Sequence, residues 1–251
     1  MKNLLKRSTP LIALGATDAL SARLIEAHGF ECVYIGSYAT AASRYALPDT
    51  GLLRLEDLVA QARTIADAVS VPVIADAEGG FDDPAATVRA FEDAGVAAIH
   101  IEDHTGAGKH TDQPQTLRPK EEMAERIYAA VAARRNPDFL IAARSDAFWV
   151  FKDLEDTIAR LTLYTKAGAD LVFPTAVGAA ELAEVRRRVD RPAMVVDLEH
   201  PDAAVVLHYA FSTLVQFNAL SEQLKNFRLP GGQAALEDFL GYKDPPRRRP
   251  R

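Results

Sequence analysis

The sequence predicts a (β/α)₈ barrel, or TIM barrel, an α/β fold whose active site lies at the C-terminal ends of the strands. Short runs rich in Val, Ile and Ala alternate with longer stretches of helical period, and this alternation recurs about eight times. Three turns, in "AHGFECVYI", "DAGVAAIHI" and "KAGADLVFP", place a glycine where a helix ends before a strand. Eight strands favour a closed barrel over an open sheet, and no Gly-x-Gly-x-x-Gly motif follows the first strand.

The elements follow from the same patterns in chain order. The expected strands are short apolar runs bounded by turns, at 11–14, 32–35, 71–75, 98–102, 139–144, 171–173, 193–196 and 213–217. The expected helices lie at 18–28, 54–69, 84–94, 120–134, 154–167 and 180–189, with a weaker one from residue 220. The stretch 54–69 gathers apolar side chains on one helical face: Leu55, Leu58, Val59, Ala62, Ile65 and Ala66.

Length and composition bound the class of protein. The chain has 251 residues, and we expect one barrel domain over 1–243 and a disordered basic tail over 244–251, in "KDPPRRRPR". A formal charge of -6 and a pI near 5.6 argue against a nucleic-acid or anionic-membrane binder. Cys32 is the one cysteine, which excludes an internal disulfide and a thiolate metal cluster. With no signal-peptide pattern and no apolar run of about 18 residues, we expect a cytoplasmic protein.

Acidic residues gather where the expected strands end. Asp76 and Glu78 follow the third strand in "PVIADAEGGF", Glu102 ends the fourth, and Asp197 follows the seventh. The eighth expected strand carries Gln216 at this end. Buried carboxylates repel one another, so a cation is expected between them. An oxygen-only set suits Mg²⁺ or Mn²⁺ rather than zinc, with Asp76 as the direct ligand and Glu78 and Glu102 in support.

Arg144 ends the fifth expected strand, in "DFLIAAR", at the same mouth of the barrel. A guanidinium in this place is suited to hold a substrate carboxylate with two parallel hydrogen bonds. The alternative is an ion pair with a neighbouring acid, Glu102 or Asp146.

Two long segments near this mouth are candidate lids. "DHTGAGKHTDQPQTLRP" separates the fourth strand from its helix, and its Lys109 and His110 can donate protons or supply a positive field. The alternative is a solvent-exposed loop without a role. "SRYALPDTG" follows the second strand, and its Asp49 can complete the acid cluster or, alternatively, cap the next helix.

With these residues placed, the chain resembles the isocitrate lyase/phosphoenolpyruvate mutase superfamily, and within it the methylisocitrate lyase-like branch. The resemblance rests on "ALGATDALSARLIEAHGFECVYIGS", "VPVIADAEGGF", "AAIHIEDHTGAGKH", "FLIAARSDAF" and "AGADLVFPTA", in this order. It implies an Mg²⁺ site and homo-oligomers, dimers or tetramers. The metal residues it implies are Asp76, Glu78, Glu102 and Asp49. The expected substrate-binding residues are Tyr34, Gly36, Ser37, Tyr38, Arg144 and Thr175, and the expected catalytic residues are Lys109, His110 and Arg144.

The sequence also departs from the pattern of that family. Glu78 stands where an aspartate is usual, and Thr175 replaces the glutamate of a Phe-Pro-Glu motif. The lid lacks the catalytic cysteine of the lyases and has Lys109 and His110 in its place. The resemblance therefore implies an Mg²⁺-dependent C–C lyase for a small 2-hydroxy or 2-oxo acid, acting through an enolate on the metal, either methylisocitrate lyase-like or oxaloacetate decarboxylase-like. The alternatives are phosphonopyruvate mutase or hydrolase chemistry, and an inactive barrel that binds a metabolite or a partner protein.

Overall fold

The computed structural model describes residues 1–106, 108–225, 227 and 231–242. The chain divides into two compact units, Met1–Thr213 and Leu214–Arg251. The first unit contains all eight strands, and the single domain expected over 1–243 stays a prediction. The basic tail expected over 244–251 lies outside the described residues.

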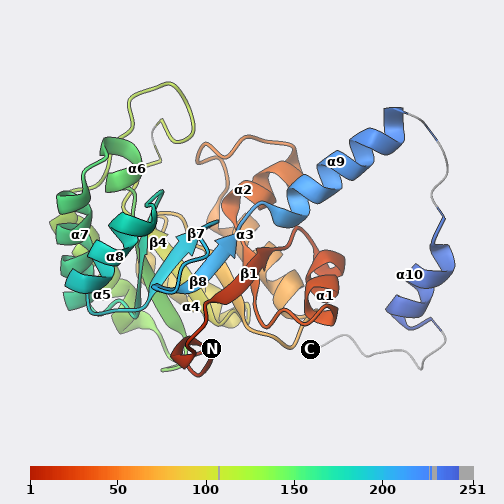
Figure 1. Ribbon diagram of the computed structural model, residues 1–251, viewed down its shortest axis with the longest axis horizontal. Coiled ribbons are helices and arrows are strands. Elements are labelled where there is room, and N and C mark those ends of the chain that lie inside the picture. The colour runs from red at the N-terminus through yellow and green to blue at the C-terminus, as the bar shows by residue number, and fades with distance from the viewer. Residues whose placement is uncertain (107, 226, 228–230, 243–251) are drawn as a thin grey trace. The chain divides into compact units, whose positions relative to one another are not determined.

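The eight strands form a closed parallel barrel in which each strand pairs with its neighbours in sequence and β8 pairs with β1 (Figure 1). The predicted fold class is therefore confirmed. The strands are β1 (Leu11–Gly15), β2 (Val33–Ile35), β3 (Val73–Asp76), β4 (Ala98–Glu102), β5 (Leu140–Ser145), β6 (Leu171–Pro174), β7 (Ala193–Val196) and β8 (Ala203–His208).

Helices follow the strands, and α5, α7 and α8 lie outside the ring of strands (Figure 1). The principal helices are α1 (Ala19–Ala27), α3 (Leu55–Ala66), α4 (Pro84–Asp93), α5 (Lys120–Ala133), α7 (Leu154–Lys166), α8 (Ala179–Arg188), α9 (Phe211–Lys225) and α10 (Gln233–Leu240). Shorter helical turns are η1 (Leu4–Lys6), α2 (Ser37–Thr40), η2 (Ala41–Tyr45) and α6 (Ala147–Phe151). Among the described residues, none of these helices is long and apolar enough to cross a membrane.

The alternation of side chains along each strand builds two cores. On β4, Ile99 and Ile101 face outward and pack in the large cluster between strands and helices, whereas Ala98 faces the barrel interior. Cys32, immediately before β2, is fully buried in the interior cluster, as a packing residue would be. The two clusters hold the strand ends in fixed positions, which is what a site built from those ends requires.

The eighth strand was predicted at the wrong place. Residues 213–217 belong to helix α9, and the strand that closes the barrel is β8, ten residues earlier. Thr213 and Val215 are β-branched, which favours a strand locally, but the run "AAVVLH" of β8 fits the pairing with both β7 and β1. Gln216 therefore does not end a strand.

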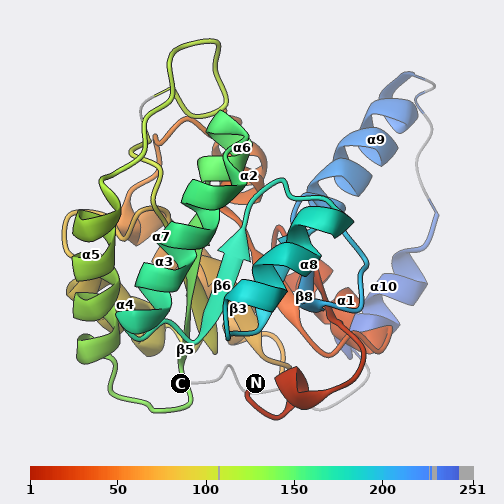
Figure 2. The same ribbon diagram turned by 60° about the vertical axis from the view of Figure 1, so that its left-hand side comes forward.

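The catalytic end of a TIM barrel is the end to which its strands point. Figure 2 shows α6 and the segment between β4 and α5 at the end to which the arrow of β6 points. The candidate lid between β4 and α5 and the last residues of the strands therefore belong to the same end of the barrel.

Candidate active site

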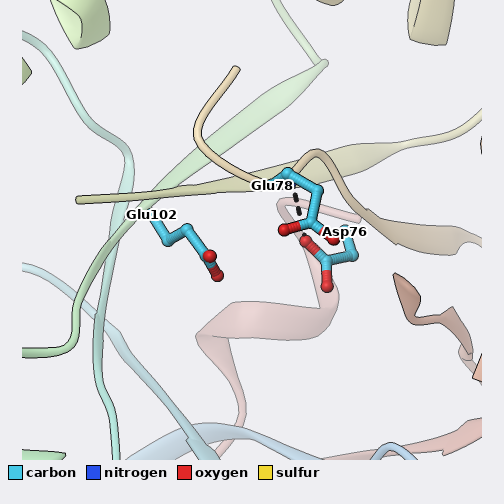
Figure 3. Close-up of side chains that lie close together, drawn as sticks. All are labelled: Asp76, Glu78 and Glu102. Atoms are coloured by element: carbon cyan, nitrogen blue, oxygen red, sulfur yellow. Dashed lines mark hydrogen bonds between the residues drawn. The ribbon is translucent and has the colours of Figure 1, made fainter. Parts of the chain in front are cut away.

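The three acids predicted from the strand ends lie together. Asp76 is the last residue of β3, Glu102 is the last of β4, and Glu78 follows β3 by two residues. One carboxylate oxygen of each lies within 4.8 Å of those of the other two (Figure 3).

A strained turn brings Glu78 into this group. Its φ is 48°, a left-handed conformation that is uncommon outside glycine. The N–H of Glu78 donates to Oδ1 of Asp76 at 2.9 Å (Figure 3). Its carbonyl accepts from the N–H of Glu102 at 2.8 Å. These two bonds fix the turn from both strands, so the carboxylate of Glu78 folds back toward Asp76. Strain of this kind is concentrated at functional sites.

Asp76 is held by the residues around it. Oγ and the N–H of Ser37, at the start of α2, donate to its Oδ2 at 2.9 and 3.3 Å. Nδ1 of the buried His100 lies 3.6 Å from its Oδ1, while Nε2 of His100 lies 2.9 Å from the hydroxyl of Tyr34. Asp76 therefore has a single orientation, with a carboxylate that faces the site.

Asp49 lies beside the acid group rather than within it. Its Oδ2 accepts from Oγ of Ser37 at 3.4 Å and is 3.4 Å from Nε2 of His110. Helix α3 has Arg54 at its N-cap position, so Asp49 does not cap that helix. It joins the lid to the residue that holds Asp76.

The segment between β4 and α5 is folded over the site. An antiparallel bridge joins His104 to Leu117 at its base. Gly108 has a φ of 75°, and a Cβ there would meet the carbonyl oxygen of Pro114 at 2.6 Å, so the turn needs glycine. This tight turn delivers Lys109 to a buried position, with only 1% of the residue exposed.

Lys109 supplies a positive charge to the acid group. Its Nζ lies 2.8 Å from Oε2 of Glu78 and 2.9 Å from Oε1 of Glu102. The neighbouring His110, with a φ of 56°, keeps 43% of its side chain exposed and lies with its ring 5.1 Å from that of Trp149. Of the two lid residues, Lys109 is thus held between carboxylates while His110 faces the space above them.

Arg144 forms the ion pairs that were the alternative to substrate binding. Its Nη1 lies 2.9 Å from Oε2 of Glu102, and its Nε and Nη2 donate to the carboxylate of Asp146 at 2.8 and 3.1 Å. Its Nε also donates to Oγ1 of Thr175 at 3.1 Å, and its guanidinium lies over the ring of Phe173. Arg144 is therefore rigidly oriented at the edge of the cavity, where a ligand can still reach it.

The protonation of the three acids is uneven. Burial alone would raise the pKa of Asp76, but His100 and the Lys109 ammonium lower it below the usual range. Burial and the negative charge of Asp76 raise the pKa of Glu78. Burial also raises the pKa of Glu102 to about 8, although two cations contact it. The group is therefore short of positive charge, and the oxygen donors fit a hard divalent cation such as Mg²⁺ or Mn²⁺.

The raised pKa of Glu102 predicts a pH dependence of stability without metal. In the folded protein Glu102 keeps its proton up to about pH 8, whereas in the unfolded chain it loses the proton near its usual pKa of 4.5. The free energy of unfolding therefore falls as the pH rises from 4.5 to 8. Burial lowers the pKa of His100 to about 4, which has the opposite effect below pH 6.5. Between pH 6.5 and 8 we expect the free energy of unfolding in EDTA to fall by at most about 2 kcal/mol.

Urea unfolding at several pH values in EDTA measures this effect. The Glu102→Gln variant, which cannot lose the proton, should show a flatter profile over the same range. Equal slopes in the variant and the parent protein would contradict the assignment to Glu102.

A cavity of about 430 Å³ lies beside the acids. All six expected substrate-binding residues line it, as do Asp49, Asp76, Lys109 and His110. Glu78 and Glu102 are not among the lining residues, but both contact Lys109. Six further lining residues were not predicted to belong to the site: Trp149, Phe173, Ala176, Val196, Asp197 and Tyr209. Asp197 was predicted only to follow a strand. Trp149 lies shortly after the end of β5, and this position could have indicated that it lines the site.

The fold and the site together define a TIM barrel with a carboxylate cluster and an oriented arginine at the face where such barrels carry their active sites. Residues 1–221 match the model of the family described as phosphoenolpyruvate phosphomutase. The chain therefore belongs to this family, within the isocitrate lyase/phosphoenolpyruvate mutase superfamily that the motifs had predicted.

Relatives of known sequence and structure agree with this assignment. The chain is 42% identical over 177 residues to 2,3-dimethylmalate lyase of Eubacterium barkeri, covering 69% of this chain and 61% of the relative. It is 39% identical over 191 residues to 2-methylisocitrate lyase of Salmonella typhimurium, covering 74% and 64%. The crystal structure of phosphoenolpyruvate phosphomutase from Streptomyces platensis subsp. rosaceus superposes with a TM-score of 0.86 at 27% identity, covering 96% of this chain and 94% of that one. The matches thus span less than two thirds of the two lyases.

Proposed function

We propose that the protein is an Mg²⁺-dependent carbon–carbon lyase for a small 2-hydroxy or 2-oxo carboxylic acid. The observation that carries the proposal is the grouping of Asp76, Glu78 and Glu102 within 4.8 Å, beside a cavity that Arg144 lines. The likeness to 2,3-dimethylmalate lyase and 2-methylisocitrate lyase supports this reaction class over others on the same fold.

The acids would hold the metal, with Asp76 as the direct ligand. Asp76 lines the cavity, whereas Glu78 and Glu102 do not and contact Lys109 instead. When bound, Mg²⁺, or Mn²⁺ in its place, supplies a Lewis acid for the carboxylate and the C2 oxygen of the substrate.

The cavity orients the substrate through its polar residues. The Arg144 guanidinium is fixed by Asp146 and Thr175 and presents a positive edge to a substrate carboxylate. The Tyr34 hydroxyl is held by His100 and lines the cavity together with Ser37. Because these groups are already oriented by buried partners, little reorganisation is needed when charge develops on the substrate.

The bond-breaking step needs one proton removed and one delivered. The C2 hydroxyl gives its proton to a carboxylate of the cavity wall, for which Asp49 is placed, and its electron pair forms the C2 carbonyl. The C2–C3 bond breaks, and its electron pair passes to C3 and the carboxylate that C3 bears. His110 then donates a proton to C3, which completes a 2-oxo acid and a second carboxylic acid. The same residues suit the decarboxylation of a 2-oxo dicarboxylic acid, in which carbon dioxide is the leaving fragment.

Pyruvate release tests this function directly. The substrates are 2,3-dimethylmalate, 2-methylisocitrate, oxaloacetate and phosphonopyruvate, each with EDTA or with Mg²⁺. We expect metal-dependent pyruvate from at least one carbon acid, and a loss of roughly 10²-fold or more in kcat for His110→Ala. His28→Ala is the matched control, because His28 is exposed at the end of α1.

The other outcomes are informative. Release from phosphonopyruvate alone would replace the proposal with phosphorus–carbon chemistry. No release from any substrate, with Mg²⁺ bound, would favour a barrel that only binds. An unchanged His110→Ala variant would remove His110 as the proton donor.

We also propose a homo-oligomer, a dimer or a tetramer. Helix α9 leaves large apolar side chains exposed, including Leu214, Phe217, Leu220 and Leu224 at 50 to 68%. Exposed apolar patches of this kind mark interaction surfaces. Light scattering measures the mass, and a monomer at micromolar concentration would contradict the proposal.

We place the protein in the cytoplasm because its one cysteine, Cys32, is buried, and cell fractionation tests this placement.

A further inference from the structure

We propose, on the basis of the function above, that the substrate carries an uncharged, apolar substituent at C3, with room for an aromatic ring. This substituent would lie in the part of the cavity that faces the acids. The preferred substrates would then be alkyl- or aryl-substituted malates rather than tricarboxylic acids, which bear a third negative charge at this position.

The barrel places this part of the cavity opposite the acids. The strands follow one another around the ring in sequence order, so β7 lies across from β3, which ends on Asp76. Val196 ends β7, Ala176 follows β6 and Tyr209 follows β8, and all three line the cavity. These three residues form an apolar arc across from the acids, and Asp197, which follows Val196, adds a negative charge to it rather than a cation.

An aromatic pair extends this apolar arc toward β2. The rings of Tyr38 and Tyr209 meet edge to face, with centroids 5.4 Å apart. A Cβ at Gly15, the last residue of β1, would lie 2.1 Å from the carbonyl oxygen of Tyr209. Glycine at this position lets the chain after β8 cross the end of β1, so that Tyr209 reaches Tyr38.

Trp149 completes the wall beside the proton donor. It lines the cavity from α6, and its ring lies 5.1 Å from the ring of His110. A group at C3 would therefore be protonated by His110 while its substituent lies against Trp149. Large, flat side chains of this kind bind apolar groups well.

The charges of the cavity favour the same substituent. Of the described residues that line it, Lys109 is the one lysine and Arg144 the one arginine. Each is held by two carboxylates, Lys109 by Glu78 and Glu102 and Arg144 by Glu102 and Asp146. Asp49, Asp76 and Asp197 line it with the opposite charge. A further substrate carboxylate placed against the apolar arc would lose its hydration, and the one cation of the lining left to pair with it would be the protonated His110, which must give its proton to C3.

A series of malates that differ only at C3 tests the inference. The series is 2-methylmalate, 2,3-dimethylmalate, 3-benzyl-2-methylmalate and 2-methylisocitrate, whose C3 groups are hydrogen, methyl, benzyl and carboxymethyl. We expect kcat/KM for pyruvate release to rise by roughly threefold or more from hydrogen to methyl, and to be highest for benzyl. For carboxymethyl we expect a value at least about tenfold below that for methyl.

Two variants of the wall make the test specific. Val196→Lys adds a cation to the apolar arc and should raise the carboxymethyl-to-methyl ratio of kcat/KM by at least about tenfold. Trp149→Ala should lower the benzyl-to-hydrogen ratio by a similar factor. Tyr128→Lys is the control for the added charge, because Tyr128 is 66% exposed on α5. Ratios within one variant do not depend on how much of the protein is folded.

The outcomes separate this inference from the function on which it rests. If carboxymethyl is the best substituent, or if Val196→Lys leaves the ratios unchanged, the inference is overturned while the lyase activity stands. If no member of the series yields pyruvate but oxaloacetate does, the reaction is a decarboxylation and both the cleavage step and this inference fail.

Discussion

The Asp76→Asn variant is expected to lose roughly a thousandfold in kcat/KM for any substrate that the protein cleaves. Asp76 is the acid of the group that faces the cavity, and its pKa is held below the usual range, so it is ionised at neutral pH. The amide removes the negative charge but can still accept the bond from the N–H of Glu78, whereas its NH2 group cannot accept from the N–H of Ser37. The thermal midpoint in EDTA therefore separates a loss of the metal ligand from a loss of stability.

The measurement is kcat/KM at saturating Mg²⁺, together with the thermal midpoint in EDTA. Asp82→Asn is the matched control, because Asp82 is exposed six residues further along the chain. Asp82→Asn should retain the kcat/KM of the parent protein. An Asp76→Asn variant with activity within about tenfold of the parent would contradict the role of Asp76 as the direct ligand.

The Lys109→Met variant is expected to show the largest loss of stability in the absence of metal. Its Nζ lies between the buried carboxylate of Glu102 and the part-buried carboxylate of Glu78, and removing one partner of a buried ion pair costs about 3–5 kcal/mol. Methionine retains the bulk of the side chain but leaves Glu78 and Glu102 without this cation. Mg²⁺ can restore the positive charge, so it should raise the midpoint of the variant more than that of the parent.

Urea unfolding of parent and variant in EDTA and in Mg²⁺ measures both effects. Lys2→Met is the matched control, because Lys2 pairs with Asp138 at the surface, where an ion pair contributes about 1 kcal/mol at most. Fluorescence of Trp149, the one tryptophan of the chain, reports in parallel on the lid, since its ring lies 5.1 Å from that of His110. Equal stability of Lys109→Met and the parent in EDTA would contradict the account of this residue.

The fold was predictable because most of its signals are local. The glycine turns and the apolar runs identified seven strands and the longer helices between them within a few residues, but not the short helices α2, η2 and α6. The eighth strand was not identified, because the β-branched residues of α9 imitate a strand and the pairing of β8 with β1 joins the two ends of the barrel. Such closure is a long-range property, and no local pattern reports it.

The acids of the site were predictable for a geometric reason. In a parallel barrel the last residues of neighbouring strands lie close together, so the sequence alone predicts that Asp76 and Glu102 are neighbours. The position of Lys109 could not be predicted in this way, because it depends on how a long segment folds over the site. The same holds for Tyr209, which reaches the cavity by crossing β1 next to Gly15.

The most direct test of the central claim is the binding of Mn²⁺ to the parent protein, followed by electron paramagnetic resonance with and without oxalate. Oxalate presents two adjacent oxygen donors, as a 2-oxo carboxylate does. The account predicts one tight Mn²⁺ per chain, bound at least about tenfold more tightly with oxalate, and the loss of both effects in Asp76→Asn. A protein that binds no Mn²⁺, or binds it equally with and without oxalate and with and without Asp76, would contradict the account.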